Sequence, residues 1–263
     1  MNDRWRGWEN AEIYDRFVRE RRIYRWLNER LVERASLADA RRVLDLGCGT
    51  GATTAACLRR LPADAEVLGI DASAEMVALA RAQTLDPRAR FVVADATALA
   101  DAAEGMFDRC VSNAAFWQFP DRPRVLAALA DRLEPGARFV FNVPAERVGD
   151  DDTPVHPFQV ALARAIGERL GERFVQTATP FDPDAFRGEA REFGLDLVAC
   201  ERLESEGPQG ELVELMGIPA MIAPLSAGLD ARETEQALAD AAGAADLDER
   251  VRVPWLYLTV LRT

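Results

Sequence analysis

Glycines and polar side chains stand directly after four apolar, strand-like runs in the first half of the chain. Gly47, Gly49 and Gly51 follow residues 43–46, Asp71 follows 66–70, Asp95 follows 91–94 and Asn113 follows 107–112. Ligands of an open parallel sheet bind beyond the carboxyl ends of its strands, so these groups are expected at one edge. Glycines let the backbone approach a ligand where a side chain would clash, and carboxylates accept hydrogen bonds. The spacing therefore predicts a ligand-binding site.

A further carboxylate, Asp45, lies two residues before the first glycine and inside an apolar run. Burying a carboxylate costs solvation free energy unless it meets a hydrogen-bond donor. The turn alone does not identify the ligand, because residues 47–52 also satisfy the Gly-x-Gly-x-x-Ala form of the dinucleotide fingerprint. An ordinary turn between a strand and a helix is the plainer alternative.

Alternating strands and helices are expected to position these residues. Apolar runs predict strands at residues 43–46, 66–70, 91–94, 107–112, 138–143, 195–203 and 251–261. Helical patterns cover 53–61, the stretch after Ser73, 123–133, 158–170 and 182–193. Ser73 can cap its helix, with Glu75 in the first turn. This order predicts an α/β fold with a doubly wound, mostly parallel sheet.

Segments outside this alternation are expected to form an arm and two insertions. Residues 5–36 carry an apolar stripe at helical spacing, together with Trp5, Trp8 and Tyr14. We divide the chain into an arm, 1–36, and a main domain, 37–263, with insertions at about 144–181 and 204–250. The arm either packs on the main domain or acts as a lid. The helical, apolar stretch 212–225 either closes a lid or forms a homodimer interface.

Composition excludes several kinds of site. The chain has 263 residues and a formal net charge of −12, and its basic residues are all arginine. The absence of lysine excludes a phosphate-binding Gly-Lys-Ser loop, a Schiff-base lysine and the Tyr-x-x-x-Lys pair of short-chain dehydrogenases. Strong acidity argues against a surface that grips nucleic acid or anionic lipid.

Metal binding and export are not expected either. The four cysteines are scattered and His156 is the single histidine, so no zinc site is predicted. The start of the chain lacks the apolar run of a signal peptide, and no stretch approaches the length of a membrane span. These observations favour a reduced, cytoplasmic protein without a metal.

Four motifs in this order resemble the class I S-adenosylmethionine-dependent methyltransferases. They are Leu-Asp-Leu-Gly-Cys-Gly-Thr-Gly (44–51), Gly-Ile-Asp-Ala-Ser-x-x-Met (69–76), Val-Val-Ala-Asp-Ala (92–96) and Phe-Asp-x-x-Val-Ser-Asn-Ala (107–114). The match runs from about residue 41 to 143. The resemblance implies a Rossmann-like, seven-stranded sheet whose antiparallel seventh strand lies beside the fifth, and residues 251–261 fit that place.

The resemblance also implies a role for each matching residue. Asp71 would accept both ribose hydroxyls of S-adenosylmethionine, and Asp95 would accept from the adenine amino group while the Ala96 amide donates to the ring. Met76 would pack on the adenine. Asn113 would flank the methionine end. Tyr14 of the arm is added because its hydroxyl could reach the carboxylate of the cofactor. The full predicted cofactor-binding set is Tyr14, Asp45, Gly47, Gly49, Asp71, Ala72, Met76, Asp95, Ala96 and Asn113.

The acceptor is expected to be a small organic molecule. The loop after the fourth strand reads Asn-Ala-Ala-Phe-Trp and lacks the Pro-Pro pair that amino-group methylases of nucleic acid and protein place here. Phe116 and Trp117 are either an apolar wall for the acceptor or plain core aromatics. His156, in the first insertion, is a candidate general base, and an exposed loop residue is the alternative. Glu146 is a weaker candidate.

Two other functions stay open. One is binding of S-adenosylmethionine without methyl transfer, as an accessory subunit or in other chemistry. The other is an NAD(P)-dependent oxidoreductase, because a dinucleotide-binding fold also offers an acid after its second strand. Asp95 followed by Ala96 in a short loop favours the methyltransferase.

Overall fold

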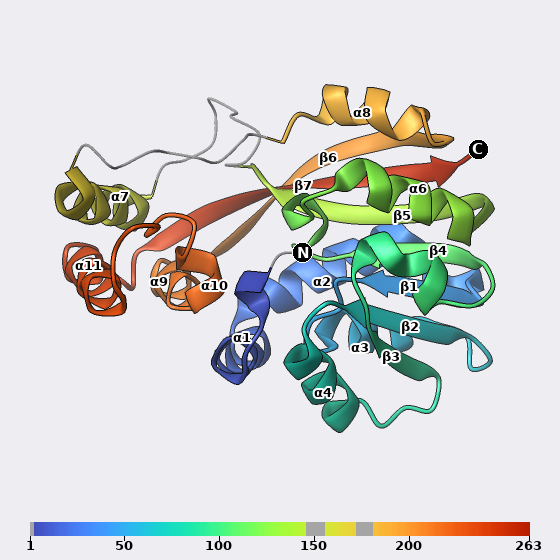
Figure 1. Cartoon of the computed structure of the whole chain (residues 1–263), viewed down its shortest axis with the longest axis horizontal. Helices are drawn as coiled ribbons and strands as arrows, with labels where there is room; N and C mark the ends of the chain where they lie inside the picture. The colour runs from blue at the N-terminus through green and yellow to red at the C-terminus, as the bar shows by residue number, and fades with distance from the viewer. Residues whose placement is uncertain (1–2, 146–155, 172–180) are drawn as a thin grey trace.

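The computed structural model describes residues 3–145, 156–171 and 181–263 of the chain. Its centre is a seven-stranded sheet with strand order β3-β2-β1-β4-β5-β7-β6 and helices on both faces (Figure 1). The strands are β1 (Arg42–Leu46), β2 (Glu66–Asp71), β3 (Ala89–Val93), β4 (Phe107–Ser112), β5 (Leu133–Pro144), β6 (Leu195–Pro208) and β7 (Arg250–Arg262).

Strand direction confirms the predicted fold class. The first five strands pair in parallel, whereas β7 pairs antiparallel with both β5 and β6. The register places Leu46 beside Ile70 and Asp71 beside Val93, so the carboxyl ends of β1, β2 and β3 lie together. The sheet is therefore doubly wound and mostly parallel, with its antiparallel seventh strand next to the fifth.

Alternate residues of the strands build a core on each face. Leu44, Leu46, Phe139 and Phe141 belong to the core on one face, while Val43, Val67 and Val140 belong to the core on the other. The helices are α1 (Trp8–Glu20), α2 (Arg22–Ala35), α3 (Ala52–Leu58), α4 (Ala74–Gln83), α5 (Leu99–Ala102), α6 (Arg122–Arg132), α7 (Pro157–Leu170), α8 (Pro183–Arg191), α9 (Gly210–Met216), α10 (Pro219–Ile222) and α11 (Ala231–Gly243).

Several element boundaries differ from those predicted. The arm is two helices that meet at Arg21, whose extended backbone ends α1 and starts α2. The predicted helical stretch 212–225 is divided into α9 and α10, and Pro219 occupies the first turn of α10. Strand β6 runs five residues beyond the predicted end at Leu203. Glu146 and much of the first predicted insertion, residues 146–155 and 172–180, lie outside the described residues.

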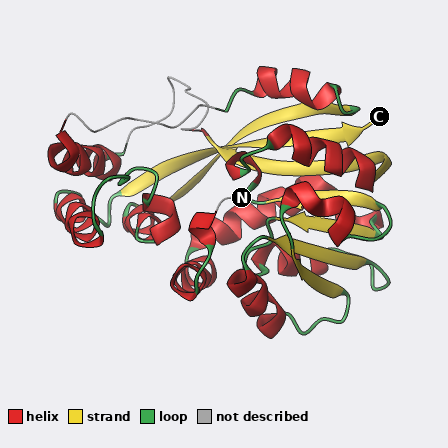
Figure 2. Ribbon diagram, in the orientation of Figure 1, coloured by secondary structure: helices red, strands yellow, loops and turns green. Residues whose placement is uncertain are grey.

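The long β6–β7 pair extends beyond the rest of the sheet and carries a separate helical lobe (Figure 2). Helices α7, α9 and α11 pack there around their own core, which includes Phe158, Ile166, Leu212 and Ala237. The lobe thus comes from the two predicted insertions. No helix in the described part of the chain is both long and apolar enough to cross a bilayer.

Substitutions at two glycines, one in the sheet and one on an exposed helix, test how tightly the sheet packs. A Cβ at Gly69 of β2 would lie 2.6 Å from Phe91 Cδ1 and 3.0 Å from Cys48 Sγ. Gly69→Ala should therefore cost about 1–3 kcal/mol of unfolding free energy through overpacking. Gly188, exposed within α8, has no atom within 4 Å of its added Cβ. Gly188→Ala should stabilise by roughly 0.5–1 kcal/mol. Urea unfolding measures both, and equal effects of the two substitutions would contradict this account.

Candidate functional site

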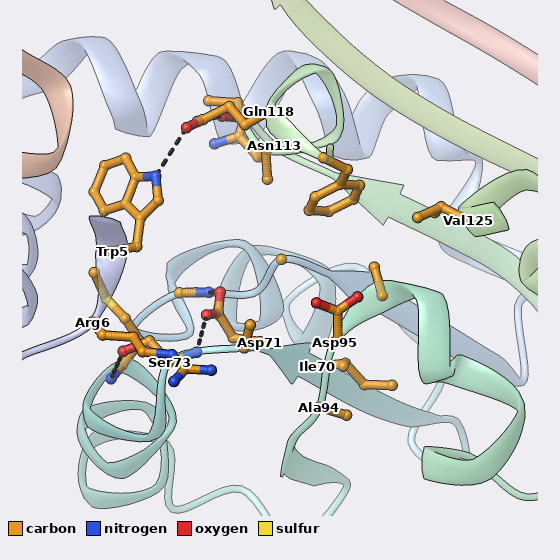
Figure 3. A pocket seen from close by; sticks show the side chains of 18 of the residues that line it. Trp5, Arg6, Ile70, Asp71, Ser73, Ala94, Asp95, Asn113, Gln118 and Val125 are labelled. Carbon is orange, nitrogen blue, oxygen red and sulfur yellow. Dashed lines mark hydrogen bonds between the residues drawn. The ribbon is translucent and has the colours of Figure 1, made fainter. Parts of the chain in front are cut away.

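A cavity lies at the carboxyl ends of β1, β2, β3 and β4, where the sequence predicts a ligand site. Its empty space of about 940 Å³, part of it open to solvent, falls within the range of small-molecule sites. Asp71 and Asp95 line one wall, and Trp5 and Gln118 line the opposite one (Figure 3). Nine of the ten predicted cofactor-binding residues line the cavity: Tyr14, Gly47, Gly49, Asp71, Ala72, Met76, Asp95, Ala96 and Asn113.

The glycine turn needs both its conformation and its lack of side chains. Gly47 and Gly49 have φ angles of +75° and +52°, which disfavour other residues. A Cβ at Gly47 would lie 2.6 Å from Ala115 Cβ, and one at Gly49 would lie 3.2 Å from Tyr14. The amides of Gly47 and Cys48 donate to the Ile70 carbonyl at 2.8 and 3.0 Å. The turn is thereby tied to the end of β2.

Asp71 holds the turn from the other side. Its Oδ2 accepts from the Gly49 amide at 2.9 Å, and its Oδ1 accepts from the Ser73 amide at 2.9 Å. Burial raises the pKa of Asp71, and the amide bonds oppose that rise. Each carboxylate oxygen has two lone pairs, so both can still accept from a ligand in the cavity.

Asp95 begins a short 3-10 helix, Ala96–Ala98. Its Oδ1 accepts from the Thr97 amide at 2.9 Å and from the Thr97 hydroxyl at 2.7 Å. Burial raises the pKa of Asp95, but the Thr97 hydrogen bonds outweigh it and the net shift is downward. Asp95 is therefore an ionised acceptor on the wall beside Asp71.

A buried amide pair fixes the loop after β4. Asn142, fully buried in β5, accepts from the Ala114 amide at 2.6 Å and donates to Asn113 Oδ1 at 2.7 Å. Ala114 has a φ of +53°, which a residue with a Cβ rarely adopts. Asn142 is not among the residues predicted from the sequence, although a lone amide within the apolar run 139–143 is a visible signal.

The arm closes one side of the cavity through contacts that the sequence did not reveal. Gln118 Oε1 accepts from the Trp5 indole at 2.9 Å and from the Arg4 guanidinium at 2.6 Å. Gln118 Nε2 donates to the Ala114 carbonyl at 2.7 Å. Asn10 accepts from the Ala220 amide at 2.9 Å and so joins α1 to α10. The arm is thus held to the loop after β4 and to the lobe.

Asp45 does not line the cavity. It is fully buried beneath the glycine turn, where the Thr54 hydroxyl donates to its Oδ2 at 2.6 Å. Its Oδ1 is buried without a hydrogen-bond partner among the described residues. Burial raises its pKa to about 7, with a smaller contribution from the charge of Asp71, and the Thr54 hydrogen bonds oppose the rise. Any contact of Asp45 with a ligand stays a prediction.

The predicted acceptor residues lie apart from this cavity. Phe116 is fully buried and packs on Phe139, Phe141 and Phe186, so it is a core aromatic in the described structure and not a wall of the site. Trp117 and His156 line a second cavity that shares Tyr24, Ala114 and Gln118 with the first. His156 is buried rather than exposed in a loop.

Removing the Gln118 amide should loosen the arm. In Gln118→Ala, the Trp5 indole and the Arg4 guanidinium lose their common acceptor, at a cost of about 1–2 kcal/mol. Amide hydrogen exchange of residues 8–14 should become faster. Gln236→Ala is the control, because it removes only an exposed bond to Asp240 within α11. Unchanged exchange in the arm would contradict the role of Gln118.

Asp45 should make stability depend on pH. Its pKa is about 7 in the folded state against an ordinary 3.8, so the native state binds more protons between these values. The contribution of Asp45 to the free energy of unfolding should therefore be complete below about pH 4. It should be lost as the pH rises to about 7, by on the order of 1.4 kcal/mol per unit of pKa shift. Asp45→Asn removes the titration. The difference in urea unfolding free energy between wild type and variant should change across this window, and a constant difference would refute the assignment.

Comparison with known proteins agrees with this geometry. The methyltransferase domain family matches residues 43–136, which run from β1 into β5. Trans-aconitate 2-methyltransferase of Deinococcus radiodurans is 43% identical over 129 residues, which are 49% of this chain and 46% of the relative. This match therefore spans about half the length of that relative. The enzyme of the same name from an Azoarcus species is 32% identical over 217 residues, 76% of this chain and 82% of the relative.

The fold has solved counterparts as well. Phosphoethanolamine N-methyltransferase 2 of Haemonchus contortus, solved in complex with S-adenosyl-L-methionine, superposes with a TM-score of 0.56 at 15% identity. The superposition covers 96% of this chain and 56% of that protein, and at this identity it shows a shared fold. With four ordered motifs around one cavity and a relative matched over most of its length, the chain belongs to the class I S-adenosylmethionine-dependent methyltransferases.

Proposed function

We propose that the first cavity binds S-adenosylmethionine and that the protein transfers the methyl group to a small organic acceptor. The observation that carries the proposal is the Asp71–Gly49 contact beside Asp95. The Asp71 carboxylate accepts a hydrogen bond from the Gly49 amide of the glycine turn, and the Asp95 carboxylate lines the same cavity. Two anionic acceptors at this place suit a ligand with hydroxyl and amino groups and no phosphate.

The charge of the cavity supports the same ligand. Among the described lining residues, Arg6, Asp71 and Asp95 carry formal charge, which leaves the walls net negative. S-adenosylmethionine carries a sulfonium and an ammonium group against one carboxylate, so its net charge is positive. A dinucleotide would bring a diphosphate to a turn whose Gly49 amide already donates to Asp71. An NAD(P)-dependent reaction thus fits this cavity less well than methyl transfer does.

Specific residues fit parts of the ligand. Asp71 would hold the ribose hydroxyls and Asp95 the adenine amino group, while Met76, which is 2% exposed, would pack against the adenine. Tyr14, Asn113 and the Gly47–Gly49 backbone would serve the methionine end. Ala72 and Ala96 also line the cavity.

Methyl transfer is an in-line displacement that depends on alignment and on exclusion of water. S-adenosylmethionine supplies an electrophilic methyl group. Trp5, Arg6 and Tyr14 of the arm wall the cavity and would keep water out. Burial raises the pKa values of Tyr14 and Tyr24, so both hydroxyls are protonated donors at neutral pH and not bases.

Other expectations from the sequence accompany this proposal. The net charge of −12 remains the argument against nucleic-acid and membrane partners, and a homodimer through the lobe stays open. A cytoplasmic location, the division of the chain at residue 36 and a lid function for the lobe are likewise proposals. Binding of S-adenosylmethionine without methyl transfer is the alternative function, and an acceptor panel with detection of transferred methyl distinguishes it.

Asp71→Asn tests the cofactor site. One face of the amide carries hydrogen atoms, so it cannot accept from both Gly49 and Ser73 as the carboxylate does. Affinity for S-adenosylhomocysteine should fall by about 1.5–3 kcal/mol, roughly 10- to 150-fold, as titration calorimetry can measure. Asp64→Asn, in an exposed loop, is the control and should leave the affinity unchanged. NADH should bind neither protein; tight NADH binding, or unchanged affinity in folded Asp71→Asn, would overturn the proposal.

A further inference from the structure

The hydrogen bonds of the buried amide pair Asn113 and Asn142 run in one defined direction. The backbone N–H of Ala114 can only donate, so the Asn142 atom that meets it at 2.6 Å is the amide oxygen. The amide nitrogen of Asn142 is then the atom that donates to Asn113 Oδ1 at 2.7 Å. One backbone amide thus decides which end of each side chain is oxygen and which is nitrogen.

A tyrosine beside Asn142 supports the same direction. Tyr257, fully buried in β7, donates its hydroxyl hydrogen to the Leu27 carbonyl at 3.3 Å, and a carbonyl can only accept. The Tyr257 oxygen therefore meets Asn142 as an acceptor. Burial raises the pKa of Tyr257, and the hydrogen bond from Asn142 opposes the rise. Asn142 thus turns its nitrogen to Tyr257 and its oxygen to Ala114, and a reversed amide would lose both contacts.

This direction makes Asn113 a hydrogen-bond donor. Its Oδ1 accepts from Asn142, and its Nδ2 has no hydrogen-bond partner among the described residues. The amide is planar with oxygen and nitrogen on different sides, so the two N–H groups are directed away from Asn142. Asn113 lines the first cavity, on the wall that also carries Trp5 and Gln118 (Figure 3). Its N–H groups are therefore available to a ligand there.

The two walls of the first cavity then suit different ligand groups. Asp71 and Asp95 are acceptors, and they suit hydroxyl and amino groups. Asn113 on the other wall offers hydrogen atoms, and it suits an oxygen. The amino-acid end of S-adenosylmethionine carries an ammonium group, which can only donate, and a carboxylate, which can only accept. The N–H groups of Asn113 would repel the ammonium group and attract the carboxylate.

We infer that Asn113 donates hydrogen bonds to the carboxylate of S-adenosylmethionine and that Asn142 is the positioning residue that fixes this polarity. The inference rests on the proposed function and makes its cofactor site more specific. Hydrogen bonds to an ionised acceptor are shorter and stronger than those between neutral groups. Asn142 is fully buried, so it acts on the ligand through Asn113 and not by contact.

Asn113→Asp replaces the donor by an acceptor with almost no change in size. One carboxylate oxygen still accepts from Asn142, and the other faces the cavity. Affinity for S-adenosylhomocysteine, which carries the carboxylate, should fall ten-fold or more. Methylthioadenosine has the adenosine and the sulfur but no amino-acid group, so its affinity should stay within two-fold. Titration calorimetry measures both ligands.

Asn142→Asp reverses the polarity from outside the cavity. The new carboxylate still accepts from the Ala114 amide but has no N–H for Asn113 Oδ1. The Asn113 amide should turn its nitrogen to this carboxylate and present its oxygen to the ligand. Affinity for S-adenosylhomocysteine should again fall ten-fold or more, with methylthioadenosine within two-fold. A residue with a merely structural role would weaken both ligands alike.

Asn28→Asp is the matched control. Asn28 is also buried and accepts from the Thr53 hydroxyl at 2.7 Å, but it is not part of the described lining of the first cavity. Both affinities should stay within two-fold, and circular dichroism verifies that the variants are folded. In the labelled wild type, NMR should show the side-chain amide of Asn113 shifting with S-adenosylhomocysteine and not with methylthioadenosine, a readout that needs no variant to fold.

The outcomes separate the inference from the proposed function. Failure of the wild type to bind either ligand would overturn the proposed function. Normal binding by the wild type together with unchanged S-adenosylhomocysteine affinity in folded Asn113→Asp would overturn the carboxylate contact and leave the proposed function standing. Equal losses for the two ligands in Asn142→Asp would overturn the positioning role of Asn142.

Discussion

The carboxylate of Asp71 is the contact on which the site depends. It joins three backbone segments, since it accepts from Gly49 in the turn after β1 and from Ser73 at the start of α4 while it ends β2 itself. The positive φ angles of the turn are then compatible with a fixed structure, because the amides that the turn exposes have partners. The same carboxylate faces the cavity, so the group that shapes the turn is also available to a ligand.

The buried amide pair Asn113 and Asn142 fixes the loop after β4 in the same way. Asn142 orients Asn113 and holds Ala114 in an unfavourable backbone conformation. Backbone strain of this kind persists only where the surroundings fix it, and the surroundings here are a fully buried amide inside β5. Both cavities use Ala114 as a wall, so one buried hydrogen-bond unit sets the boundary between the two cavities.

The sequence predicts features that are local to one strand and the turn after it. The strand ends at Gly47, Asp71, Asp95 and Asn113 follow from runs of a few residues, and the sheet brings them together whatever the remainder of the chain does. Phe116 could not be assigned in this way, because only packing against Phe139 and Phe186 decides that it points into the core. The same limit applies to Gln118, whose partner Trp5 lies 113 positions away.

The contact between Asn10 and Ala220 has a consequence for biosynthesis. These residues are 210 positions apart, so α1 leaves the ribosome long before α10. Gln118, which accepts from the Trp5 indole, and Ala220, which donates to Asn10, emerge much later. Helix α1 therefore cannot complete its docking while β1 to β4 are being assembled. Domains generally form as their sequence is synthesised, and contacts of long sequence separation form slowly. The arm is thus secured only after α10 has been translated, and until then this side of the cavity stays open.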